Sequence, residues 1–258
     1  MYITRKARNV LRGLLQAYAT GTIKRYMWNS EFSGGRWDCL DLTHGDCVYE
    51  YIEKYADNGS ILDLGCGSGN TGNELKETKY RQYMGVDISD VAIEKAKKRS
   101  EQSGRAEKNC FFRADIFSYV PTQQYELILL RDSIYYIPRQ KIKALLDRYV
   151  KYLKEGGVFI VRMFDGSGKH RTIVDTIERG FKIVERHFPD QSKTVVIVFR
   201  PKMPESSVSG VRGRSVNDDA EVRWGRRRRP GWSVARICVE VQRSTTAVHR
   251  AGHYICVT

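Results

Sequence analysis

The sequence lacks any long hydrophobic run. A membrane-spanning helix requires about eighteen consecutive apolar residues. No stretch of the 258 residues is that long. The longest apolar stretches, such as residues 158–161 and 195–199, have the length of buried strands. With 41% hydrophobic residues, the chain still has enough apolar side chains for one full core. These features predict a globular protein without a membrane partner.

Patterns of paired metal ligands and paired cysteines are also missing. The six cysteines include no Cys-x-x-Cys pair, and the five histidines show none of the spacings typical of zinc sites. The sequence therefore predicts neither a metal site nor a disulfide framework. It indicates a reducing compartment, which we take to be the cytoplasm.

Acidic residues are absent from the first 30 residues, which carry six basic ones. This composition is typical of an organelle presequence and equally of a basic amphipathic helix. The helix is the favoured interpretation, because apolar residues recur at helical spacing. We expect residues 1–45 to form a helical cap or lid that presses this apolar face onto the domain that follows. The apolar residues concerned are Val10, Leu11, Leu14, Leu15 and Tyr18.

Residues 201–258 differ in composition from the rest of the chain. They contain one lysine and ten arginines, whereas residues 1–200 hold 16 lysines and 17 arginines. They also show no sustained helical or strand period. We interpret this segment as a basic appendage, either a disordered extension or sequence of different origin from the domain. The four adjacent arginines at 226–229 leave a nucleic-acid-binding tail as the alternative, which the sequence does not favour.

Between these ends, expected strands and helices alternate. This order indicates a mostly parallel sheet with helices on both faces. Strands are expected at residues 61–64, 83–88, 110–116, 125–130, 158–164, 182–187 and 194–200. Helices are expected at residues 70–78, around 91–96, at 138–155 and at 172–178.

Two of these segments give the clearest signals. Residues 125–130 form a near-continuous apolar run, as a strand covered on both faces requires, so this strand should lie centrally. Residues 138–155 show the strongest helical period, with Leu153 on the apolar stripe. Pro138 suits the first turn of that helix, and the pair Gly156-Gly157 suits its end.

The expected first strand leads directly into a glycine-rich turn, Asp63-Leu64-Gly65-Cys66-Gly67-Ser68-Gly69. Glycines at alternate positions let the backbone turn tightly and approach a ligand closely. Dinucleotide-binding turns follow a G-x-G-x-x-G spacing, whereas the spacing here is G-x-G-x-G. A carboxylate two residues before the first glycine suits a ligand that carries an ammonium group and a sulfonium better than one that carries phosphates.

Two further acids follow expected strands. Asp87 lies 22 residues after Gly65, where a carboxylate can accept both hydroxyl groups of a ribose. Asp115 ends the expected strand at 110–116 and can accept from an exocyclic amine. Because the carboxyl ends of parallel strands meet at one edge of a sheet, the three acids together indicate an adenosine-containing ligand.

Residues 61–69, 85–89, 114–116 and 125–130 together resemble the successive motifs of the class I S-adenosylmethionine-dependent methyltransferases. The resemblance covers about residues 25–200. It implies a Rossmann-like three-layer sandwich at residues 46–200, with S-adenosylmethionine as cofactor. Its seven-stranded, mostly parallel sheet would have an antiparallel last strand.

The same resemblance implies roles for individual residues at the cofactor. Asp63, Gly65 and Gly67 would line the methionine part, and Asp87 the ribose. Asp115 with Ile116 would bind the adenine, and Leu130 or Arg131 would form the floor near the sulfonium. The other residues expected at the cofactor are Cys66, Gly69, Ile88 and Trp37.

The segment after residue 130 carries the signals for the acceptor. It lacks the Asn/Asp-Pro-Pro-Tyr pattern of amino-group methylases that act on adenine or glutamine, and the Pro-Cys pair of cytosine C5 enzymes. No cysteine is therefore a candidate nucleophile, and the segment is more similar to that of small-molecule methyltransferases. Asp132, Tyr135 and Tyr136 are the candidate catalytic residues, either orienting the acceptor or acting as a base. Packing under a loop is the alternative for both tyrosines.

Upstream, aromatic and charged residues gather around the pair Gly34-Gly35. Clustered aromatic side chains beside such a pair suit a lid over the site, although a segment that only buries its rings is an equal alternative. The residues of this cluster are Trp28, Glu31, Phe32, Arg36, Trp37 and Asp38.

Three functions fit these features unequally. The favoured one is a methyltransferase acting on a small molecule, with nucleic acid or protein as alternative acceptors. A binding or regulatory protein that keeps the fold but has lost catalysis is the second. A nicotinamide-dependent oxidoreductase is the third, and both the glycine spacing and the three acids argue against it.

Overall fold

The computed structural model describes residues 5–38, 43, 45–165, 168–188 and 193–202. Nearly all of the predicted appendage therefore lies outside the described residues. Within them, no helix is both long and apolar enough to cross a bilayer. The strands are β1 (Ser60–Leu64), β2 (Gln82–Asp87), β3 (Asn109–Arg113), β4 (Tyr125–Arg131), β5 (Leu153–Phe164), β6 (Phe181–His187) and β7 (Thr194–Pro201). The helices are α1 (Arg5–Tyr18), α2 (Gly21–Ser33), α3 (Val48–Ala56), α4 (Asn70–Glu74), α5 (Asp90–Gln102), α6 (Arg139–Val150) and α7 (Arg171–Gly180), with short 3₁₀ turns η2 (Glu77–Lys79) and η3 (Ile134–Tyr136).

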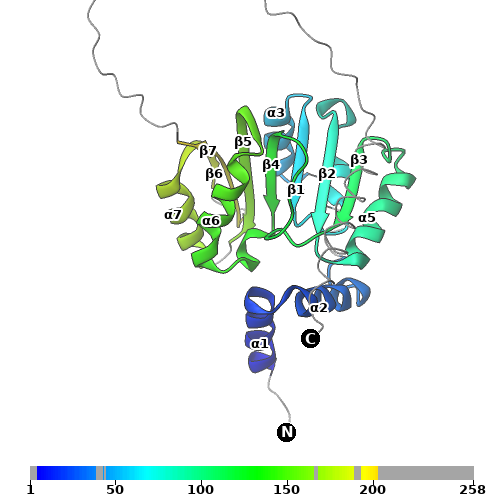
Figure 1. The fold of residues 1–258 in the computed structure, drawn as a ribbon, viewed down its shortest axis with the longest axis vertical. Coiled ribbons are helices and arrows are strands. Elements are labelled where there is room, and N and C mark those ends of the chain that lie inside the picture. The colour runs from blue at the N-terminus through cyan, green and yellow to red at the C-terminus, as the bar shows by residue number, and fades with distance from the viewer. Residues whose placement is uncertain (1–4, 39–42, 44, 166–167, 189–192, 203–258) are drawn as a thin grey trace, which may run out of the picture.

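The strands form one seven-stranded sheet in the order β3-β2-β1-β4-β5-β7-β6 (Figure 1). Pairing is parallel from β3 to β5, whereas β7 runs antiparallel to both β5 and β6. This arrangement confirms the predicted fold class, the antiparallel last strand and the central position of β4. The carboxyl ends of β1 to β5 consequently meet at one edge of the sheet.

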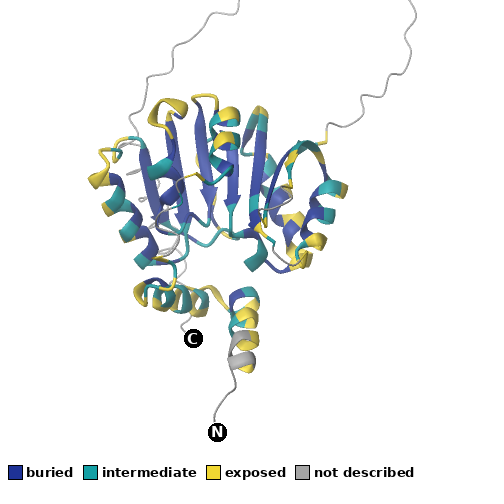
Figure 2. Cartoon of the chain, turned by 180° about the vertical axis from the view of Figure 1, so that it is seen from behind, coloured by how far each residue is buried: buried dark blue, intermediate teal, exposed yellow. Residues whose placement is uncertain are grey.

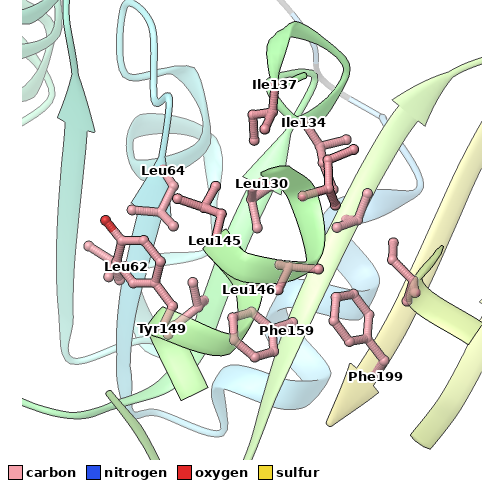
Figure 3. Close-up of a cluster of buried hydrophobic side chains, with 14 of the residues drawn as sticks. Leu62, Leu64, Leu130, Ile134, Ile137, Leu145, Leu146, Tyr149, Phe159 and Phe199 are labelled. Atoms are coloured by element: carbon pink, nitrogen blue, oxygen red, sulfur yellow. The ribbon is translucent and has the colours of Figure 1, made fainter. Parts of the chain in front are cut away.

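Helices cover both faces of the sheet, because alternate side chains of each strand point to opposite sides. On one face, Leu62 and Leu130 pack with Leu145 and Tyr149 of α6 (Figure 3). On the other face, side chains such as Ile61 pack with α3 and α5. The apolar run in β4 is buried from both sides, as a central strand requires.

The boundary between α6 and β5 differs from the prediction. The helix was expected to reach residue 155, but it ends at Val150, and Leu153 already pairs with Tyr125 of β4. The register between these strands then shifts between Tyr125 and Leu127. The glycine pair at 156–157 therefore belongs to this irregular part of β5 and does not end the helix, since an isolated Gly-Gly signal fits a bulge as well as a helix end.

Two other elements are shorter than predicted. Helix α4 stops at Glu74, before the expected residue 78, and η2 follows it. Strand β3 ends at Arg113, because the Asp115 side chain bends the chain. Its Oδ1 accepts the backbone N–H of Phe117 at 2.9 Å, which is an Asx-type turn.

Helices α1 and α2 lie below the edge of the sheet where the parallel strands end (Figure 1). The predicted helix is present, but the expectation that its apolar face presses onto the domain is wrong. Val10, Leu11, Leu14 and Tyr18 are between 50% and 60% exposed (Figure 2). The opposite side of α1 faces the domain instead, where Gln16 is buried. An ion pair between Arg12 and Glu31 of α2 fixes this orientation, a contact that hydrophobic periodicity cannot report.

Candidate functional site

Strand β1 ends in a turn with three left-handed glycines. Gly65, Gly67 and Gly69 have φ angles of +88°, +54° and +77°, a region that side chains rarely adopt. At Gly65 space is limiting as well, because a Cβ atom would lie 2.6 Å from the Cβ of Ser133. The turn thus leaves bare backbone at the carboxyl end of β1.

A cavity of about 370 Å³ opens beside this turn, a size within the range of small-molecule sites. It follows the carboxyl ends of β1 to β5 and is covered by side chains of α1 and α2. The structure brings most of the predicted site residues together here. Those lining the cavity are Asp63, Gly65, Cys66, Gly67, Asp87, Ile88, Asp115, Ile116, Arg131, Asp132, Tyr135, Tyr136 and Trp37.

Two predicted cofactor residues do not line the cavity. Leu130 is fully buried in the core beside α6, because side chains of β4 alternate, and the neighbouring Arg131 faces the cavity instead. Gly69 precedes α4, where a Cβ atom would lie 2.7 Å from that of Ala96. Its role in the structure is close packing between α4 and α5.

Asp63 lies at the inner end of the cavity and is only 1% exposed. The hydroxyl of Tyr83 donates to its Oδ2, while Oδ1 has no hydrogen-bond partner among the described residues. Burial raises the pKa of Asp63 to about 7. The site therefore holds a buried carboxylate oxygen that lacks a donor, and a ligand ammonium group can supply one. This observation fits the methionine end of S-adenosylmethionine.

Asp87, at the end of β2, links the glycine turn to α5. Its Oδ2 accepts the backbone N–H of Gly67 at 3.0 Å, and its Oδ1 accepts that of Ser89 at 2.9 Å. Burial raises the pKa of this carboxyl group, whereas these backbone bonds lower it. A carboxylate has about four lone-pair positions, so both oxygens retain capacity to accept ribose hydroxyl groups.

Asp115 marks the opposite end of the cavity, beyond β3. The apolar side chains of Ile88 and Ile116 line the cavity with it, so this part offers apolar surface to a ring such as adenine. Lys24 of α2 also lines this end, with its Nζ 5.3 Å from the ring centroid of Phe117. No pattern in the sequence distinguished Lys24 from other surface lysines.

The side of the cavity where the sequence predicts the acceptor is built around Asp132, directly after β4. Asp132 adopts a left-handed φ of +52°, which is unusual for a residue other than glycine and concentrates at functional sites. Its carboxylate pairs with Arg162 of β5 and accepts from the hydroxyl of Tyr135 at 3.2 Å. Arg162 and Arg131 both reach the same carboxylate oxygen of Asp46, each at 3.0 Å.

The two candidate tyrosines stay protonated at neutral pH. Burial raises the pKa of Tyr135 far above its usual value and that of Tyr136 to about 12. Burial likewise raises the pKa of the Cys66 thiol. At neutral pH these protonated side chains can donate hydrogen bonds.

Aromatic rings from the predicted lid segment cover this side of the cavity. The ring of Trp28 lies 4.9 Å from that of Tyr136 in a T-shaped contact, and Trp37 lies 5.8 Å from Trp28. Glu31 holds the group in place, because it accepts from the indole N–H of Trp37 at 3.1 Å and pairs with Arg12 of α1. We call Trp28, Phe32, Trp37 and Tyr136 the aromatic cover.

The sequence interpretation missed several cavity residues, among them four that come from distant elements. Gln16 and Lys24 reach the cavity only because α1 and α2 cross the sheet edge, and Arg162 and Phe164 only because β5 pairs with β4. Positions of this kind depend on contacts between distant elements. The one available signal was the polar Gln16 next to the apolar stripe of α1.

The fold and this site define a class I S-adenosylmethionine-dependent methyltransferase domain. The strand order, the glycine turn and the acids at or just beyond the carboxyl ends of β1, β2 and β3 are its features. The family model described as a methyltransferase domain matches residues 56–203, and the chain belongs to this family. S-adenosylmethionine is accordingly its cofactor.

Two similar curated proteins each align with 42% of the chain. An mRNA cap guanine-N(7) methyltransferase of Schizosaccharomyces pombe is 29% identical over 123 residues, covering 42% of this chain and 34% of that protein. A trans-aconitate 2-methyltransferase of Enterobacter sp. is 34% identical over 111 residues, covering 42% of this chain and 40% of that protein. The aligned region thus spans well under half of either relative.

Solved structures share the fold at low sequence identity. The N-methyltransferase NodS of Bradyrhizobium japonicum, in complex with S-adenosyl-l-homocysteine, superposes with a TM-score of 0.56 at 17% identity, covering 69% of this chain and 98% of that one. A TehB-like methyltransferase of Corynebacterium glutamicum gives 0.52 at 22% identity, covering 67% and 98%. At these identities the likeness establishes the fold alone.

Proposed function

We propose that the protein transfers a methyl group from S-adenosylmethionine to a small-molecule acceptor. When bound, this cofactor supplies a methyl group on a sulfonium, so that a nucleophile can attack the methyl carbon in line and displace the sulfur. Asp63 would hold the ammonium group, Asp87 the ribose hydroxyls and Asp115 the adenine amine. The unpartnered Oδ1 of Asp63 supports this orientation, because it is a buried acceptor at the methionine end.

The aromatic cover is the observation that carries the choice of a small acceptor. Trp28 and Trp37 both contact Tyr136 and line the cavity with it, so an acceptor would have to fit beside their rings. The similarity to trans-aconitate methyltransferases supports the same class. RNA is the second candidate acceptor, because mRNA cap methyltransferases are similar over an equal share of the chain.

The acceptor side supplies orientation more than proton transfer. Asp132 is engaged by Arg162 and Tyr135, and the raised pKa values keep both tyrosines protonated. Among the described residues that line this side, we identify no unengaged carboxylate to serve as a base. Holding a nucleophile in line with the methyl group supplies most of the rate in such a reaction. The arrangement therefore favours an acceptor that is already nucleophilic at neutral pH.

A labelling experiment tests this function. The full chain is incubated with S-adenosylmethionine carrying a tritiated methyl group and with three separate pools: ultrafiltered small molecules, total RNA and protein from a cell extract. We expect label in the small-molecule pool. Label confined to RNA or protein would contradict the small acceptor. No transfer to any pool, with intact S-adenosylhomocysteine binding by calorimetry, would instead favour a binding or regulatory protein.

A further inference from the structure

A second cavity continues the site beyond the aromatic cover. Its volume is about 370 Å³, and it lies between α1 and the segment that precedes α7. Gln16, Tyr135, Tyr136 and Phe164 line both cavities, so the two spaces meet there. None of the residues predicted at the cofactor lines the second space. We call it the acceptor chamber, lined by Gly13, Gln16, Ala17, Tyr135, Tyr136, Phe164, Lys169 and His170.

Gln16 places an unused hydrogen-bond donor at the junction of the two cavities. The residue is 6% exposed, and its Nε2 has no acceptor within the described part of the chain. An unpaired buried amide costs about 1–3 kcal/mol, and an aliphatic side chain would avoid that cost at a position facing the core. A ligand oxygen at this point would satisfy the donor.

Arg162 provides a second unused donor. Its terminal nitrogens are engaged by Asp132 and Asp46, whereas its buried Nε has no acceptor among the described residues. Asp132 also accepts from Tyr135, whose ring lines the acceptor chamber. Arg162 lines the first cavity, and Asp132 links it to Tyr135, which lines both cavities.

One lysine in this region has no ion-pair partner among the described residues, and the nearby Asp165 accepts from the backbone N–H of His170. Arg131 and Arg162 are matched by Asp46 and Asp132. Lys169 lines the acceptor chamber, and no described carboxylate lies within ion-pair distance of its Nζ. One positive charge and two free N–H donors suit a planar monoanion with two oxygens. A phosphate dianion would require further cations or donors.

We propose that the acceptor is a small carboxylic acid whose carboxylate is bound where the two cavities meet, between Gln16, which lines both, and Arg162 of the first cavity, with Lys169 of the acceptor chamber compensating its charge. This inference rests on the proposed small-molecule methyltransferase function. It adds the chemical class of the acceptor and assigns Gln16 as a residue that positions it. The carboxylate is bound as an anion, so no proton has to leave for recognition.

The first test fractionates the acceptor pool. The ultrafiltered small molecules are separated by anion exchange, and each fraction is offered to the full chain with tritiated S-adenosylmethionine. We expect label in the acidic fraction, and loss of that label when carboxylates are first blocked with a carbodiimide and glycinamide. Label in the non-acidic fraction, or loss on phosphatase treatment, would overturn the inference and leave the proposed function standing. No label in any fraction would contradict both.

The second test changes Gln16 itself, using the purified active acid. Gln16→Glu removes the amide donor and adds a repelling charge, so we expect KM to rise about tenfold to a hundredfold with kcat within about threefold. Calorimetry should show the same loss of acid binding to the S-adenosylhomocysteine-bound protein, whose affinity for S-adenosylhomocysteine itself stays unchanged. Gln102→Glu makes the same substitution at an exposed position of α5 and should alter neither value. Unchanged acid binding in Gln16→Glu would overturn the role of Gln16.

Discussion

We predict that Asp63 couples ligand binding to pH. Burial raises its pKa to about 7 in the free protein, and an ammonium group favours the ionised form. Affinity is therefore full above pH 7 and falls as the carboxylate becomes protonated below it. For S-adenosylhomocysteine we expect Kd to rise about tenfold between pH 8 and pH 6, measured by calorimetry.

Asp63→Asn is the control for this pH effect. It replaces the titrating oxygen with an amide, so binding should be weaker at pH 8 and should change little toward pH 6. Any remaining change reports the ligand's own amino group. A parent protein with the same shallow pH profile as the mutant would rule out Asp63 as the partner of the ammonium.

Asp87 should contribute to affinity through the ribose. Asp87→Ala removes the acceptor of two hydroxyl groups, and we expect S-adenosylhomocysteine binding to weaken by about 1–3 kcal/mol. The substitution also removes the bonds from Gly67 and Ser89 that fix the turn. Asp87→Asn, which keeps part of this acceptor capacity, should lose less. Equal calorimetric affinities for Asp87→Ala and the parent protein would remove this residue from the site.

Single residues were predictable where the motif fixes both residue type and place. The glycines and the three acids follow strands whose ends a sequence pattern can locate. Leu130 shows the limit, since a one-residue step along β4 decides whether a side chain enters the core or the cavity. Gln16 and Arg162 show another limit, because their neighbours come from elements distant in sequence.

At the scale of elements, the turn after β1 has no room for a side chain. In Gly65→Ala, the new Cβ would lie 2.6 Å from that of Ser133, on a backbone with φ of +88°. We expect loss of S-adenosylhomocysteine binding and a drop in unfolding free energy of about 2–4 kcal/mol in urea. Gly104→Ala is the matched control, because its φ is +68° but no atom lies within 4 Å of the added Cβ. Its cost should be about 1 kcal/mol. Equal effects of both substitutions would show that contact with Ser133 is unimportant.

Helix α1 is held by polar contacts, and its apolar stripe is turned outward. The double substitution Leu11→Lys and Leu14→Lys should therefore change the unfolding free energy by about 0.5 kcal/mol or less. Arg12→Ala, which breaks the pair with Glu31 under the aromatic cover, should weaken S-adenosylhomocysteine binding more than the double substitution does. A loss of several kcal/mol in the lysine variant would mean that the stripe is packed against the domain.

The elements themselves were more predictable than their ends. Strand β4 was located by its composition, because a strand buried on both faces is a continuous apolar run. Helix α6 was located by its period, because a helix buried on one face has a periodic apolar stripe. The end of α6 was placed too late, since Leu153 fits a helical stripe and a strand equally well. Leu153 belongs to β5 because it pairs with Tyr125 of β4. The sequence of one segment does not show which other segment it pairs with.

For the whole molecule, the site follows from the order of the strands. The chain turns from β1 to β2 and β3 on one side and to β4 and β5 on the other. Such a reversal leaves a crevice at the carboxyl ends of the central strands, where α/β proteins bind ligands. Alternating strands and helices were therefore enough to predict both the fold class and the edge that carries the site. The orientation of the cap on that edge could not be predicted from the sequence, because polar contacts between distant residues set it.

The final prediction concerns the extent of the domain. Strand β7 is buried between β5 and β6 and pairs as far as Pro201 with Phe181, so a chain that ends at Lys202 keeps every strand of the sheet. We expect this shortened chain to bind S-adenosylhomocysteine as tightly as the full chain, with an unfolding free energy within about 0.5 kcal/mol.

A chain that ends at Lys193 provides the contrast, since it lacks β7 and its buried residues 195–199 and should not fold cooperatively. RNA or DNA binding that requires residues 203–258 and weakens steeply with salt would assign the tail, with its four arginines at 226–229, a separate function. Weaker S-adenosylhomocysteine binding after truncation at Lys202 would contradict the boundary itself. The tail would then have to contribute to the methyltransferase domain, because all seven strands remain in the shortened chain.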